Sequence, residues 1–235
     1  MPSGPDRNTD GEWDGFYKII GPVPTGRTNG GVAVALACDA AYDWDERGVL
    51  AIETVSGKRL WRYATGPGVY DACLADVCGD STMEILLTTS SPDNAGRPEV
   101  NGTSSSRCYL AVLDARGDLL WQKTLSDTCQ YVAFLKAADF RGDGKAEVVT
   151  ATHNSHPSRP PDRVSVWAGD TGALLESVTL PAPALGLGVW TGRSDSAADV
   201  FVGTRGGGVL HYEYSPARLE LSHHREARSE ERRVG

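Results

Sequence analysis

Residues 139–149 read Asp-Phe-Arg-Gly-Asp-Gly-Lys-Ala-Glu-Val-Val. Turn-forming residues and carboxylates precede a short apolar run, so the stretch predicts a tight turn that leads into a β-strand. Calcium prefers carboxylate and carbonyl oxygens, and glycine lets the chain bend closely around an ion. The turn is a candidate calcium site with four oxygen donors: Asp139, Asp143, Lys145 through its carbonyl, and Glu147. The alternative is an ordinary structural turn with a salt bridge from Arg141 to a carboxylate.

The same frame recurs upstream and downstream. Asp76, Asp80 and Glu84 precede Ile-Leu-Leu and form a second, weaker candidate metal site. The downstream copy has Thr191 at its first position and keeps only the carboxylates of Asp195 and Asp199. A motif that recurs every 50–60 residues or so indicates a repeat architecture.

A second motif lies between the carboxylate turns. Residues 49–61, 109–121 and 164–175 each contain an apolar run, a polar turn with Gly and a second apolar run, which predicts a β-hairpin. Residues 208–221 hold a weaker copy. In the clearest unit the predicted strands are 132–138, 147–152, 163–168 and 174–180.

Four short antiparallel strands repeated at this period predict an all-β fold, a β-propeller or partial propeller of about four blades. The predicted organisation is a polar segment, four blades and a tail that fits no blade: 1–15, 16–66, 70–126, 131–181, 184–224 and 225–235.

The stretch from Ala138 to Val149 resembles the FG-GAP (VCBS) repeat of integrin-α-like β-propellers. The hairpin at 51–61 resembles the tryptophan-docked repeat of quinoprotein-like propellers. The resemblance implies six to eight blades, so we expect the chain to be a fragment whose partners include the missing blades. The family has Asp or Asn at the third turn position, where Arg141 and Cys78 stand here, so calcium affinity should be lower. The pair Trp61 and Trp121 is expected to pack between strands or blades.

Residues 228–235, Arg-Ser-Glu-Glu-Arg-Arg-Val-Gly, resemble a translated sequencing adapter. Our hypothesis is that the reading frame runs from a gene into adapter; the alternative is a natural charged tail. The polar start, residues 1–14, does not resemble a signal peptide. Because the resembled family is mostly exported, we expect Met1 to be internal and the parent protein to be extracellular, periplasmic or on the cell surface. A cytosolic member is the alternative.

The net charge of −8 argues against nucleic acid or an anionic membrane as partner, and no 18-residue apolar run predicts membrane insertion. The number of cysteines is odd, and connectivity does not follow from sequence. Disulfides 73–78 or 108–129 are one alternative, and buried free thiols are the other. The five cysteines are Cys38, Cys73, Cys78, Cys108 and Cys129.

Strand order places the carboxylate turns on one face of a propeller and the longer loops, 39–48, 90–107 and 153–162, on the other. Aromatic, amide and acidic side chains near those loops would suit a carbohydrate or a protein ligand. A solvated rim without a ligand is the alternative. The candidate ligand face consists of Tyr70, Asp71, Gln130, Tyr131, His153, Asn154 and His156.

No catalytic motif is present in the sequence. The favoured function is a non-catalytic binding or scaffold propeller with calcium-stabilised turns. The alternative is a fragment of a carbohydrate-active enzyme, because rhamnogalacturonan lyases carry similar calcium-turn blades.

Overall fold

The computed structural model describes residues 18–23, 32–37, 47–93, 99–155, 161–192, 198–215 and 218–226; within 18–23, 32–37 and most of 218–226 it describes only the backbone. These residues form sixteen strands in four four-stranded antiparallel sheets. The predicted fold class is confirmed. The hypotheses on Cys38, His156, Asp195 and residues 228–235 lie outside the described residues.

Each sheet is one blade whose strands follow chain order. Blade 1 contains β1 (Lys18–Val23), β2 (Val32–Ala37), β3 (Gly48–Glu53) and β4 (Arg59–Ala64). Blade 2 contains β5 (Val69–Ala75), β6 (Glu84–Thr89), β7 (Cys108–Leu113) and β8 (Leu119–Ser126). Blade 3 contains β9 (Tyr131–Ala138), β10 (Glu147–Asn154), β11 (Arg163–Trp167) and β12 (Leu174–Thr179). Blade 4 contains β13 (Ala184–Trp190), β14 (Ala198–Thr204), β15 (Gly208–Ser215) and β16 (Arg218–Glu226).

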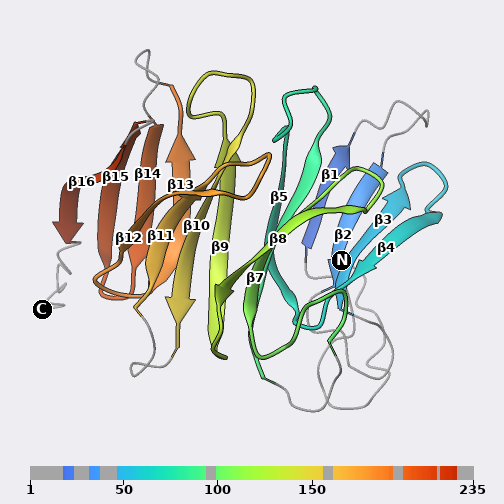
Figure 1. Cartoon of the computed structure of the whole chain (residues 1–235), viewed down its shortest axis with the longest axis horizontal. Coiled ribbons are helices and arrows are strands. Elements are labelled where there is room, and N and C mark those ends of the chain that lie inside the picture. The colour runs from blue at the N-terminus through green and yellow to red at the C-terminus, as the bar shows by residue number, and fades with distance from the viewer. Residues whose placement is uncertain are drawn as a thin grey trace, which may run out of the picture.

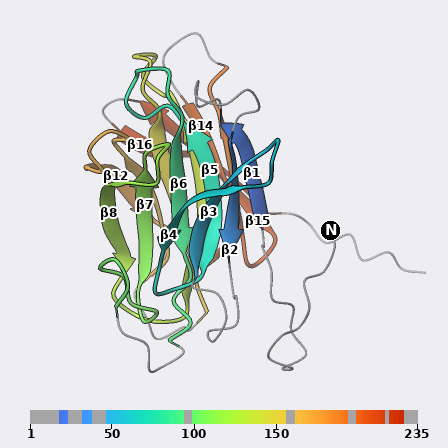
Figure 2. The same ribbon diagram turned by 90° about the vertical axis from the view of Figure 1, so that its right-hand side faces the viewer.

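The four blades stand side by side in chain order, from blade 1 in blue to blade 4 in red (Figure 1). The first strand of each blade contacts the first strand of the next: β1 meets β5, β5 meets β9, and β9 meets β13. The turned view shows the sheets stacked face to face (Figure 2). β16 continues to Glu226, into the segment predicted as a tail, because Arg225 and Glu226 pair with β15.

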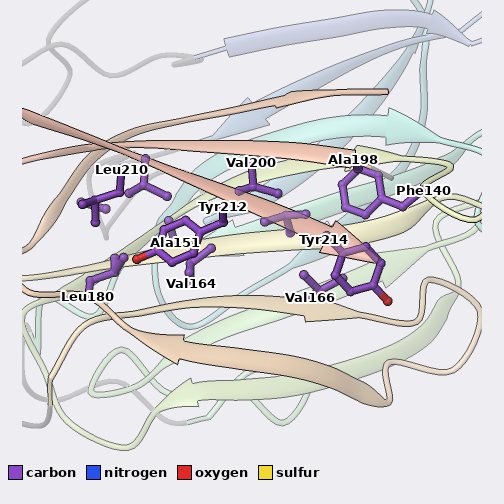
Figure 3. Packing of buried hydrophobic residues seen from close by; sticks show 13 residues of the cluster. Phe140, Ala151, Val164, Val166, Leu180, Ala198, Val200, Leu210, Tyr212 and Tyr214 are labelled. Carbon is purple, nitrogen blue, oxygen red and sulfur yellow. The ribbon is translucent and has the colours of Figure 1, made fainter. Parts of the chain in front are cut away.

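The core lies between blades, because alternate side chains of a strand point to opposite faces of its sheet. Leu86 and Val112 of blade 2 pack with Val148 of blade 3. On the other side of blade 3, Val149, Val164 and Val166 belong to a cluster with Val200, Leu210 and Tyr212 of blade 4 (Figure 3). Each inner blade is therefore buried on both faces.

Two tryptophans join neighbouring blades, which confirms the packing prediction. Trp61 Nε1 donates to the Ala115 carbonyl of blade 2 at 3.2 Å, and Trp121 Nε1 donates to the Gly169 carbonyl of blade 3 at 2.7 Å. Each indole covers a turn glycine: a Cβ at Gly117 would lie 2.5 Å from the Trp61 ring, and one at Gly172 would lie 2.7 Å from the Trp121 ring. Each of these tryptophans thus links its blade to the next blade and acts as a staple between them.

The two ends of the sheets differ. At one end, the turn face, the Ala146 N–H donates to the Asp76 carbonyl at 2.8 Å, which joins two carboxylate turns. At the other end, the loop face, the Ser91 N–H donates to the Tyr131 carbonyl at 2.8 Å. Hydrogen bonds between blades therefore stabilise both ends.

None of the four described cysteines forms a disulfide, so neither suggested pairing is present in the described part of the structure. Cys108 is fully buried, and burial raises the pKa of its thiol to about 12. Within the described ranges, no helix is long and apolar enough to cross a membrane.

Candidate functional site

The turn at 139–147 is organised by the Asp139 carboxylate. Its Oδ1 accepts the N–H groups of Gly142 at 2.7 Å and Asp143 at 3.2 Å, and its Oδ2 accepts the Gly144 N–H at 2.8 Å. Gly142 and Gly144 both adopt positive φ angles, 68° and 84°, which glycine adopts without strain. The side chain thus satisfies three backbone donors that the tight turn would otherwise leave unpaired.

Glu147 closes the same turn from the start of β10. Its side chain is fully buried; Oε2 accepts the Phe140 N–H at 2.9 Å, and Oε1 lies 2.6 Å from Arg141 Nε. The Arg141 guanidinium also lies 3.4 Å from Asp143. Burial raises the pKa of Glu147, whereas the Phe140 N–H and Arg141 act to lower it. The arginine at the third position is therefore the electrostatic partner of the buried carboxylate.

The turn at 76–84 repeats this geometry position by position. Asp76 accepts the N–H groups of Gly79 (2.6 Å), Asp80 (3.2 Å) and Ser81 (2.7 Å). Glu84 accepts the Val77 N–H at 3.0 Å. Ser81 adopts a φ of 65°, although it lacks the conformational freedom of Gly144. The two turns share one hydrogen-bond template.

The second turn lacks the cation of the first. Cys78 stands where Arg141 stands in the other copy. Burial raises the pKa of Glu84, and the nearby carboxylates of Asp80 and Asp76 raise it further. The hydrogen bond from the Val77 N–H lowers it. The buried carboxylate here rests on backbone hydrogen bonding rather than on an ion pair with the residue at the third position.

In the third copy of the turn, the buried carboxylate has a histidine as its partner. Asp199, the second residue of β14, is buried and lies 2.7 Å from His211 Nε2. Thr191 directly follows β13, and Asp195 lies outside the described residues. The histidine comes from the neighbouring strand β15, so the sequence spacing of the turn gives no sign of it.

The donor set of the first turn fits calcium poorly. A calcium ion takes six to eight oxygen ligands. Here both Asp139 oxygens accept N–H groups, and Glu147 pairs with Arg141. A guanidinium within the turn also repels a cation. The calcium site stays a prediction, and the hydrogen bonds to Asp139 and Glu147 organise the turn in the structure.

Arg141→Asn is expected to create a calcium response that the parent chain lacks. Asparagine restores an oxygen at the third position and removes the competing cation. We expect Tm to be unchanged by millimolar calcium in the parent chain and to rise in the variant, measured by thermal denaturation against chelator. Arg116→Asn, in an exposed turn residue of blade 2, is the control. A calcium-dependent Tm in the parent chain would instead support the calcium prediction.

The residues predicted to form the ligand face lie at the ends of β5, β9 and β10. Three of them make contacts between blades. Asp71 accepts the Leu135 N–H at 3.1 Å, His153 Nδ1 lies 2.7 Å from the Ala184 carbonyl, and Tyr70 meets Phe134 edge to face with a 5.5 Å centroid distance. These side chains hold blades 2, 3 and 4 together at the loop face.

The remaining predicted residues divide by exposure. Tyr131 and Asn154 are buried within β9 and β10, and His156 lies outside the described residues. His153 and Asn154 are strand residues rather than loop residues, because β10 continues to pair with β9 as far as Tyr131. Gln130 is exposed and has a φ of 65°. Among the described residues of the set, Gln130 has the most exposed side chain.

Sequence reasoning missed the hydroxyls that join blades 2 and 3. Thr88 Oγ1 donates to the Ala133 carbonyl at 2.5 Å, and the Tyr131 N–H donates to Ser91 Oγ at 2.8 Å. A threonine or serine at the end of a strand is too common for its spacing to reveal such a contact. Only the packing of one blade against the next assigns it.

No protein-family model matches the sequence, and no curated protein matches it. Among solved structures, the chain is similar to the Dos1 propeller (TM-score 0.51, 12% identity, covering 83% of this chain and 45% of that one). It is similar to the WD40 domain of SCAP from fission yeast (TM-score 0.50, 12% identity, covering 87% of this chain and 43% of that one). It is also similar to rhamnogalacturonan lyase YesW (TM-score 0.48, 14% identity, covering 87% of this chain and 44% of that one). The chain spans less than half the length of these structures. At such identities the likeness shows the β-propeller fold alone.

Proposed function

We propose that this chain is a non-catalytic binding scaffold that presents its loop face to a carbohydrate or protein ligand. The observation that carries the proposal is the asymmetry between the two ends of the blades. On the turn face the carboxylates are engaged by backbone N–H groups, Arg141 and Lys145. Longer connections, such as the one between β6 and β7, lie at the other end.

The described loop-face residues support recognition rather than chemistry. Among the described residues of the set, the carboxylate of Asp71 and the imidazole of His153 are engaged in contacts between blades. A general acid or base must instead reach the proton that it transfers. Long loops on a rigid scaffold are where binding residues concentrate. The proposal does not depend on calcium.

Binding is tested by titrating the full chain with soluble polysaccharides, including rhamnogalacturonan, and following heat by calorimetry. We expect saturable binding without release of unsaturated or reducing ends. Gln130→Gly removes an exposed loop-face side chain without backbone strain and is expected to weaken binding at least about threefold. Arg116→Gly on the turn face is the matched control.

The enzyme alternative is tested in the same samples. Cleavage of rhamnogalacturonan by the chain would contradict the non-catalytic proposal and support the carbohydrate-active alternative. If Arg116→Gly weakened binding and Gln130→Gly did not, the ligand would lie on the turn face. That result would contradict the assignment of the loop face.

A further inference from the structure

Asp199, His211 and Glu213 form a cluster on the side of blade 4 that points away from blade 3. One donor atom from each residue lies within 4.8 Å of the others. Asp199 pairs with Glu213, and Phe201 pairs with His211, in the register of β14 and β15. Because Val200, Leu210 and Tyr212 pack toward blade 3, these alternating neighbours share the opposite face.

The imidazole of His211 is held in a fixed orientation. Its Nε2 lies 2.7 Å from Asp199 Oδ1, and Phe201 stacks on the ring at a centroid distance of 4.7 Å and an angle of 9°. Asp199 is only 4% exposed. A buried carboxylate and a stacked imidazole on rigid strands give a metal site the preorganisation that it needs.

Comparison of the blades shows that the fold does not require this cluster. In each of these blades the second strand has a buried acid at its start, and the residue two positions later pairs with a residue of the third strand. This pair is Leu86 with Val112 in blade 2 and Val149 with Val166 in blade 3. All four are fully buried aliphatic residues. Blade 4 pairs Phe201 with His211 at the same register. An aromatic–histidine pair thus replaces an aliphatic one beside the acid.

We propose that Asp199, His211 and Glu213 bind a divalent transition metal ion, with Zn²⁺ as the preferred ion. One imidazole and two carboxylates are ligands that zinc accepts, whereas calcium prefers oxygen ligands alone. Donor atoms about 2.0–2.2 Å from one zinc ion lie at most about 4.4 Å apart, so small side-chain rotations bring the cluster into coordination.

The site is tested on the tag-free full chain after treatment with chelator. Titration with ZnCl₂ is followed by calorimetry, and titration with CoCl₂ is followed by visible absorption. We expect one ion per chain, a rise in Tm on binding, and visible absorption bands of a low-symmetry cobalt site. His211→Ala and Glu213→Gln are expected to weaken zinc binding at least about tenfold. Asp127→Asn, an exposed carboxylate that pairs with Arg107, is the control and should bind as the parent does.

Circular dichroism without metal checks that the variants are folded, and Glu213→Gln leaves the buried Asp199–His211 pair in place if His211→Ala fails to fold. Absence of zinc binding in the parent chain would overturn the proposal. So would binding that both variants retain, or binding lost in His153→Gln but not in His211→Ala, since the ion would then lie elsewhere.

Discussion

Replacing Trp121 with alanine is expected to lower the free energy of unfolding by about 3 kcal/mol. The indole is half-buried between blades 2 and 3, covers Gly172 and donates to the Gly169 carbonyl at 2.7 Å. Loss of a buried tryptophan costs about 3–5 kcal/mol, and partial exposure places this site at the lower end. Chemical denaturation monitored by circular dichroism measures the change.

Two further variants separate the contributions to this effect. Trp121→Phe keeps a ring but loses the hydrogen bond, so it should cost less than the alanine variant. Trp190→Ala is the control, because that ring is 55% exposed and should cost under about 1 kcal/mol. Equal losses at Trp121 and Trp190 would contradict the assignment of Trp121 as a staple between blades. Blade 3 has Glu176 at the matching hairpin position, so its junction with blade 4 lacks this tryptophan staple.

Glu147→Ala is expected to cost about 3 kcal/mol, and Glu84→Ala about half as much. Both substitutions remove the acceptor of a buried backbone N–H, from Phe140 and Val77 respectively. Only the first also leaves a guanidinium without its buried partner, and removal of one member of a buried pair is strongly destabilising. The arginine is partly exposed, which keeps the cost at the lower end of the range for buried pairs.

The pair of variants is compared by urea denaturation at neutral pH. Arg141→Ala in the Glu147→Ala background serves as the control for effects of Arg141 that are independent of Glu147. Equal costs for the two glutamates would show that Arg141 contributes nothing to the first turn, contrary to the geometry.

The same carboxyl groups give stability a pH dependence of known sign. Burial raises the pKa of Glu84, so the folded state binds that proton more tightly than the unfolded chain. The contribution of Glu84 to the free energy of unfolding is complete below the ordinary carboxyl pKa and is lost as the pH rises through the raised one. Glu84→Ala should remove this decrease in stability with rising pH. A substitution that only leaves a cavity would not change the pH dependence.

The sequence predicted the blades because the repeat signals are local. A turn glycine, an aspartate that satisfies neighbouring N–H groups and an apolar alternation all act within a few residues of one another. In blade 3 the predicted strands end within two residues of the observed ones, for example 147–152 against Glu147–Asn154. The ligand face was harder to predict, because the side chains of Asp71 and His153 contact partners in the next blade.

By itself, the sequence of this protein determined the strand pattern, the carboxylate turns and the tryptophan hairpins, since each depends on the order of nearby residues. Only the tertiary structure decided which partners these groups have. It paired Arg141 with Glu147, set Trp121 against Gly169, and brought Asp199 to His211 from the next strand. The physical reason is that hydrogen bonds and ion pairs form between atoms a few ångströms apart, and packing rather than sequence spacing sets those distances.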